Sequence, residues 1–126
     1  MGSMILPDTS VWINHFRGGE RLLEPLLRSE DLLVHPFVIG ELAVGQLPRR
    51  ADTIRRLKLQ MTAPVIEPSD VLSFIEQHQL SGRGLGYVDV QLLASVHSLV
   101  NAWLWTTDKR LDIAADQLGI AHKSKE

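Results

Sequence analysis

The chain has 126 residues, of which 44% are hydrophobic and 22% are charged, and its formal net charge is −2. This length and apolar content predict one globular domain and exclude intrinsically disordered and fibrous proteins. The lack of cysteine excludes disulfides, thiolate nucleophiles and zinc–thiolate sites, and the negative net charge means that nucleic-acid binding would require a local basic patch.

No run in the sequence approaches the roughly 20 apolar residues that a membrane-spanning helix requires, and the first residues lack the basic region of a signal peptide. We therefore expect a cytoplasmic protein without a membrane partner. Residues 1–3 resemble a cloning remnant, so we expect a single domain over residues 4–126, with Met4 as its natural start.

Short apolar runs alternate with segments that have helical spacing. In chain order they predict a strand at 4–6, a helix at 20–29, a strand at 32–35, helices at 36–44 and 50–60, a weaker strand at 64–67, helices at 69–78 and 87–99, a strand at 102–106 and a helix at 109–118. Ser69 is the predicted cap of the helix that follows it. Strands that alternate with helices predict an α/β fold with a parallel sheet and helices on both of its faces.

Four carboxylates stand in unusual surroundings. Asp8 and Asp108 each follow a predicted strand, whereas Glu41 and Asp89 are isolated charges within long apolar segments. A buried lone carboxylate is costly unless something compensates it, and the segments around Glu41 and Asp89 contain no cation. These four acids are therefore the first candidates for a functional site.

The carboxyl ends of parallel strands and the starts of adjacent helices meet in one crevice, where we expect the four acids to converge. Such a cluster is self-repelling unless a divalent cation lies between the carboxylates. Hard oxygen ligands without cysteine or a shared histidine select Mg²⁺ or Mn²⁺. Each acid also has a plainer interpretation: Asp8, Asp89 and Asp108 as helix caps, and Glu41 as a residue that faces solvent.

The four acids lie in the segments PDTSVWIN, PFVIGELAVG, GYVDVQLLAS and WTTDKRL. In this order they resemble the four acidic motifs of the PIN-domain ribonucleases, and the whole chain resembles the VapC toxins of bacterial toxin–antitoxin pairs. The resemblance implies a PIN-like parallel sheet, with Asp8, Glu41, Asp89 and Asp108 as metal ligands and catalytic residues. It further implies cleavage of structured RNA such as tRNA or rRNA, inhibition of translation, a homodimer and neutralisation by a cognate VapB-type antitoxin.

Two small hydroxyl residues are candidates for a supporting role. In similar proteins a hydroxyl at the position of Ser10 orients the acidic cluster, and Thr107 is adjacent to Asp108. Capping of a helix is the alternative for both of them.

Several arginines are candidates for contact with RNA. Arg83 lies in the glycine-rich loop 81–86, from which it could reach a phosphate bound near Asp89. The alternative is that Arg83 is an ordinary loop residue. Arg50, Arg55 and Arg56 belong to a basic run that suits RNA phosphates, but that run is also typical of a solvated helix face or of a surface for the antitoxin.

The leading interpretation is a magnesium-dependent endoribonuclease, in which a metal ion held by carboxylates lowers the pKa of a water molecule and neutralises charge on the phosphate. One alternative is a phosphohydrolase with Asp8 as its covalent nucleophile. Such enzymes usually have a second acid two residues later, where this chain has Ser10. The other alternative is a non-catalytic binding module, which predicts no binding of divalent metal.

Overall fold

The structure is a computed structural model that describes residues 3–18 and 23–123. Its strands are β1 (Met4–Pro7), β2 (Leu33–Val34), β3 (Met61–Thr62) and β4 (Ala102–Trp105). β1 pairs in parallel with β4, and β2 pairs in parallel with β3. A parallel bridge between Ile5 and Leu32 joins the two pairs, and Ala121 forms a further bridge beside β4. The strand order is therefore β3–β2–β1–β4.

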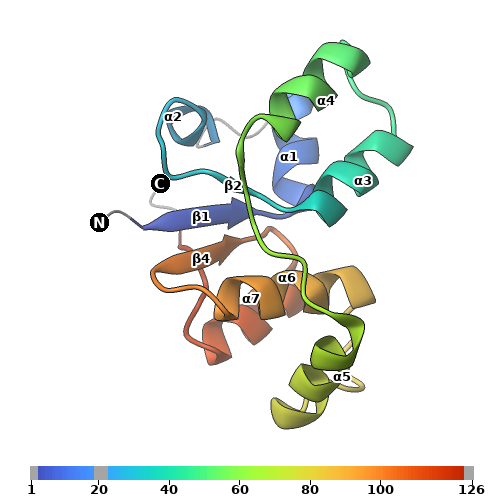
Figure 1. Cartoon of the computed structure of the whole chain (residues 1–126), viewed down its shortest axis with the longest axis vertical. Helices are drawn as coiled ribbons and strands as arrows, with labels where there is room; N and C mark the ends of the chain where they lie inside the picture. The colour runs from blue at the N-terminus through green and yellow to red at the C-terminus, as the bar shows by residue number, and fades with distance from the viewer. Residues whose placement is uncertain (1–2, 19–22, 124–126) are drawn as a thin grey trace.

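The helices are α1 (Thr9–Phe16), α2 (Leu23–Leu27), α3 (Pro36–Val44), α4 (Arg50–Lys58), α5 (Pro68–Gln77), α6 (Tyr87–His97) and α7 (Lys109–Gln117). Figure 1 shows α1 to α4 gathered on one side of β1 and β4, and α5 to α7 on the other. The predicted α/β architecture with a parallel sheet between helices is thus confirmed. Within the described part of the chain, no helix has the length and hydrophobicity needed to cross a membrane.

α3 begins at Pro36, as predicted, and its first turn is capped by a buried histidine. Nδ1 of His35 accepts a hydrogen bond from the backbone N–H of Phe37 at 3.0 Å. Burial lowers the pKa of His35, which favours the neutral ring that this bond requires, since a protonated imidazole has no acceptor. This cap fixes the start of the helix that carries Glu41.

The strand predicted at 64–67 is wrong. The strand lies earlier, at β3, and its ladder ends where the N–H of Ala63 donates to a carbonyl of β2 at 3.0 Å. Pro64 has no N–H with which to continue the ladder. The backbone of Ile66 pairs instead with the side chain of Gln91 on α6, which accepts at 2.6 Å and donates at 3.1 Å.

Two predicted helix boundaries also change. Ser69 does not cap α5, because the helix begins at Pro68 and Glu67 occupies the cap position. Proline suits the first helical position, where its missing N–H costs no hydrogen bond. The helix predicted at 20–29 is described only as α2, which ends at Leu27, and residues 19–22 lie outside the described residues.

Candidate active site

The ends of β1 and β4 place two of the acids at the same edge of the sheet. The register sets Pro7 opposite Trp105, and the N–H of Asp8 then donates to the Trp105 carbonyl at 2.8 Å. Asp8 is buried, with 5% of its surface exposed, whereas Asp108 is exposed. The predicted convergence of Asp8 and Asp108 thus follows from parallel pairing in this register.

Asp8 and Asp108 also cap helices, as their plainer interpretation predicts. Oδ1 of Asp8 accepts the N–H of Val11 at 3.2 Å in the first turn of α1. Oδ1 of Asp108 accepts the N–H of Leu111 at 3.0 Å in the first turn of α7. The caps fix the direction in which each helix leaves the sheet, and they leave Oδ2 of each aspartate outside the cap.

Three hydroxyl groups join the two strand ends. Thr106 Oγ1 donates to Asp8 Oδ2 at 2.5 Å and accepts the N–H of Asp108 at 3.0 Å. Ser10 donates to Asp8 Oδ1 at 2.6 Å, and Thr107 Oγ1 donates to Ser10 Oγ at 2.8 Å. The structure therefore brings both predicted supporting residues into contact with the acidic site, and the three hydroxyls hold the Asp8 carboxylate in one orientation.

Thr106 is not among the site residues that the sequence predicts, although it makes the direct contact with Asp8. Thr106 and Thr107 are adjacent and chemically alike, so sequence alone does not decide between them. The pairing of β4 with β1 determines which of the two threonines contacts Asp8, because it sets which side chain lies beside the end of β1. The useful signal is that both threonines directly follow the strand.

Glu41 and Asp89 reach the site from α3 and α6. Glu41 is exposed, in agreement with its plainer interpretation, and its Oε1 accepts a hydrogen bond from Thr9 Oγ1 at 2.5 Å. Asp89 is half-buried at the third position of α6, and its Oδ2 accepts the N–H of Gly86 at 2.9 Å. Thr9, like Thr106, is a site residue that the sequence does not predict.

Electrostatic effects connect the four acids. Burial raises the pKa of Asp8 above its usual range, hydrogen bonds offset part of this rise, and the charge of Asp89 adds to it. Burial also raises the pKa of Asp89, with further contributions from the charges of Asp108 and Glu41. Asp89 thus lies within electrostatic range of the other three acids, and we call Asp8, Glu41, Asp89 and Asp108 together the acidic edge.

The donor atoms of the acidic edge suit a hard divalent cation. All are carboxylate or hydroxyl oxygens, the ligands that Mg²⁺ and Mn²⁺ prefer. None of the ion pairs found in residues 3–18 and 23–123 involves these four acids. In the same residues, no three histidine or acidic side chains are gathered into a ready-made metal site. Glu41, Asp89 and Asp8 each accept a hydrogen bond from a donor of the chain itself.

The predicted RNA-binding arginines of α4 are engaged elsewhere in the protein. Arg50 donates to two carbonyls at the end of α3. Arg55 and Arg56 pair with Asp52 at 2.5 and 3.0 Å, in exposed positions where such pairs contribute little to stability. The structure does not bring these three arginines to the acidic edge.

Arg83 is also held away from the acids. Its guanidinium donates to Oε1 of Gln117 at 2.6 Å. Gln117 is the last residue of α7, nine positions after Asp108, a separation of about 13 Å along the helix. The contact therefore ties the glycine-rich loop to the end of α7 that lies opposite Asp108.

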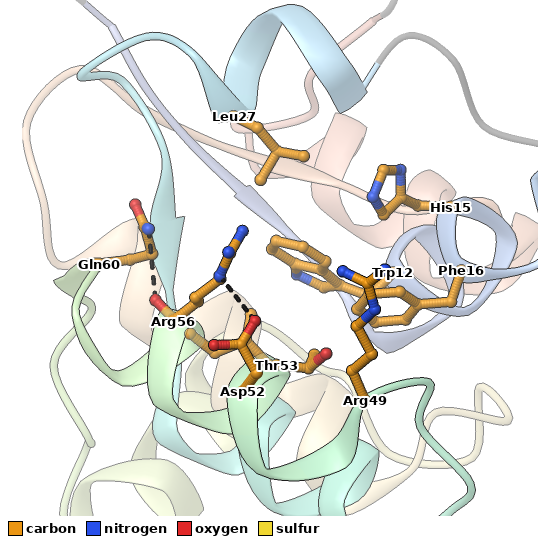
Figure 2. A pocket seen from close by; sticks show the side chains of 10 residues that line it. Trp12, His15, Phe16, Leu27, Arg49, Asp52, Thr53, Arg56 and Gln60 are labelled. Carbon is orange, nitrogen blue, oxygen red and sulfur yellow. Dashed lines mark hydrogen bonds and ion pairs between the residues drawn. The ribbon is translucent and has the colours of Figure 1, made fainter.

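A groove of about 220 Å³ lies between α1 and α4, and none of the four acids lines it. Figure 2 shows Trp12 and Phe16 from α1 facing Arg49 and Arg56. Trp12 is buried, and its Nε1–H has no hydrogen-bond partner in the described structure. A second cavity, of about 370 Å³, opens between α1 and α3 and does include Glu41.

Known proteins are similar to this chain in sequence and in fold. A family model described as "PIN domain" matches residues 5–117. The chain is 43% identical over 118 residues to "Ribonuclease VapC32" of Mycobacterium tuberculosis, in strains CDC 1551 / Oshkosh and ATCC 25618 / H37Rv, with 94% of this chain and 95% of that protein covered. The crystal structure of PAE2754 from Pyrobaculum aerophilum superposes with a TM-score of 0.63 at 18% identity, covers 97% of this chain and 90% of its own, and supports the fold alone. The chain belongs to the PIN domain family and, within it, to the VapC group.

Proposed function

We propose that this protein is a metal-dependent endoribonuclease and the toxin of a toxin–antitoxin pair. The observation that carries the proposal is the acidic edge, whose four carboxylates form no ion pair within the described residues and are electrostatically coupled through Asp89. The relative that this chain matches over nearly its whole length is named a ribonuclease. Structured RNA, in particular tRNA or rRNA, is the proposed substrate, and loss of translation in the cytoplasm is the proposed effect.

The four acids have distinct means of holding a cation. When bound, Mg²⁺ or Mn²⁺ lowers the pKa of a water molecule and neutralises charge on the scissile phosphate. Oδ1 of Asp8 already accepts two hydrogen bonds and Oδ2 only one, which leaves Oδ2 with more capacity to bind a cation. Asp108 lies beside it at the same sheet edge, and Glu41 and Asp89 complete the set from two helices.

Two alternatives are less well supported. A covalent role for Asp8 usually goes with a second acid two residues later, but this chain has Ser10 there, and Ser10 donates to the Asp8 carboxylate. A binding module that retains its acids only as caps has no use for Glu41, which caps no helix. Trapping of phosphate on Asp8 would support the first alternative, and failure to bind any divalent metal would support the second.

Cleavage of RNA in vitro tests the proposal directly. The purified protein, incubated with total RNA and millimolar Mg²⁺ or Mn²⁺, is expected to produce discrete new 5′ ends, and none when a chelator is present. Mapping these ends identifies the RNA and the position cut. Intact tRNA, rRNA and mRNA under both metal conditions would contradict the proposal.

A VapB-type antitoxin and a second copy of this chain are the proposed protein partners. For the antitoxin we favour the groove of Figure 2, where apolar Trp12 and Phe16 lie beside the cations Arg49 and Arg56. Arg49 lines this groove in an exposed position and offers N–H donors to a carboxylate of a bound peptide.

Arg49→Gln keeps the apolar wall of this groove and removes an exposed positive charge from it. If the antitoxin binds there, the variant is expected to cut RNA normally and to bind the antitoxin several-fold more weakly, the contribution of one exposed ion pair. Titration calorimetry with the DNA-binding protein encoded beside this gene measures the change. Equal affinity of the variant and the wild type for the antitoxin would place its binding site elsewhere. The proposed homodimer is tested separately, by sedimentation of the wild-type protein alone.

A further inference from the structure

Arg110 lies directly on the glycine-rich loop beside the acidic edge. Gly84 in this loop has a φ of +77°, and a Cβ placed on it would stand 2.5 Å from Nη1 and 2.9 Å from Cδ of Arg110. The arginine side chain thus fills the space that a side chain at position 84 would need. Arg110 itself belongs to the first turn of α7, two residues after Asp108.

This contact places the Arg110 guanidinium on the loop that leads into the first turn of α6, the turn that carries Asp89. Gly86, two residues after Gly84, donates its N–H to the Asp89 carboxylate at 2.9 Å. The Cα atoms of residues 84 and 86 are at most about 7 Å apart, because each residue extends the chain by no more than about 3.6 Å. Arg110 therefore lies where the loop before α6 contacts the first turn of α7, next in sequence to the two segments that carry Asp89 and Asp108.

Arg110 is exposed, and no ion pair or side-chain hydrogen bond involving it is found in the described residues. The arginines that the sequence predicts for RNA contact differ in this respect, because all of them are bound within the protein. An arginine held near an acid cluster without being paired to it keeps its planar set of N–H donors available for an anion.

We infer that Arg110 binds a phosphate of the RNA backbone next to the scissile phosphate, and so positions the strand over the acidic edge. The inference rests on the proposed nuclease function and adds a residue to it. The acids repel RNA, so a neighbouring cation has to provide attraction, and a guanidinium matches two phosphate oxygens in a bidentate contact. Arg110 takes the role that the sequence predicts for Arg83, which is bound to Gln117 instead.

Binding of a fluorescein-labelled tRNA, followed by anisotropy as salt is varied, tests this contact. An Asp89→Asn background in the presence of Mg²⁺ keeps the RNA intact during the measurement. Arg110→Gln is expected to weaken binding about tenfold and to reduce the slope of log affinity against log salt by roughly 0.7 to 0.9, the value for one phosphate contact. Arg28→Gln removes the same charge from an exposed pair with Glu24 and is expected to change neither quantity.

The two glycines of the loop provide a matched pair of variants. Gly84→Ala and Gly82→Ala introduce the same left-handed strain, at φ values of +77° and +72°, but only the former collides with Arg110. Gly84→Ala is expected to weaken RNA binding as much as Arg110→Gln does. The double variant is expected to bind RNA only slightly more weakly than either single variant. Gly82→Ala is expected to bind RNA like its parent.

The outcomes separate this inference from the proposed function. An unchanged salt slope in Arg110→Gln overturns the inference, whether or not its melting temperature falls, since a residue that only packs on the loop changes stability alone. If the wild type cuts RNA while Arg110→Gln shows an unchanged slope, only the inference about Arg110 fails and the nuclease proposal is retained. A reduced slope in a protein that cuts no RNA supports the phosphate contact and contradicts the nuclease.

Discussion

Asp89→Asn is expected to reduce RNA cleavage by about a thousandfold or more while the circular dichroism spectrum stays that of the wild type. Asp89 experiences the charges of both Asp108 and Glu41, and its own charge raises the pKa of Asp8, so it is coupled to every other member of the acidic edge. The amide oxygen of asparagine still accepts the N–H of Gly86, which preserves the first turn of α6.

Glu41→Gln and Asp112→Asn provide the comparison for this result. Glutamine at position 41 still accepts the hydrogen bond from Thr9, so a similar loss of cleavage would reflect the missing charge alone. Asp112 lies one turn after Asp108 but pairs with Lys123 at 2.8 Å, and its asparagine variant is expected to cleave normally. Cleavage retained by Asp89→Asn or Glu41→Gln would remove that residue from the proposed site.

Asp8→Asn is expected to melt several degrees above the wild type in a chelator at neutral pH. Burial and the charge of Asp89 raise the pKa of Asp8, so the folded state holds this proton more tightly than the unfolded state. Ionised Asp8 therefore opposes folding at neutral pH. For a domain of this size, a gain of about 1 kcal/mol in the free energy of unfolding would raise the melting temperature by roughly 3–5 °C.

The same linkage predicts the pH dependence. As pH falls through the raised pKa of Asp8 toward its usual value of 3.8, the wild-type carboxyl takes up its proton and regains stability that the asparagine variant already has. The difference in melting temperature should therefore shrink between neutral and acidic pH. A role of Asp8 as a helix cap alone predicts equal melting temperatures throughout, because asparagine caps as well as aspartate.

Metal is expected to reverse the order of the two proteins. A ligand that binds only the folded state stabilises it by about 2.7 kcal/mol at a concentration of 100 Kd, so Mg²⁺ or Mn²⁺ should raise the melting temperature of the wild type. Asp8→Asn should gain less, since it lacks the ligand atom Oδ2. Differential scanning fluorimetry with and without metal measures both shifts, and melts that no metal moves would contradict the proposed metal site.

Local patterns in the sequence were sufficient to predict most helices and the parallel α/β architecture. Apolar spacing and the alternation of strands with helices are properties of short segments, which the later packing of the chain preserves. Where a side chain from a distant segment replaces a backbone partner, local patterns fail: Gln91 binds Ile66, and the predicted strand at 64–67 does not form.

The sequence by itself also determined that Asp8 and Asp108 lie together, because parallel strands end at a common edge. Only the tertiary structure decided that Thr106 bonds to Asp8 and that Glu41 is exposed. It also decided that Arg83 is bound to Gln117, whereas Arg110 packs against Gly84 without an ion pair in the described structure. The physical reason is that strand register and contacts between distant segments depend on residues tens of positions away in the sequence. The end of a strand, in contrast, is predicted by the residues that immediately follow it.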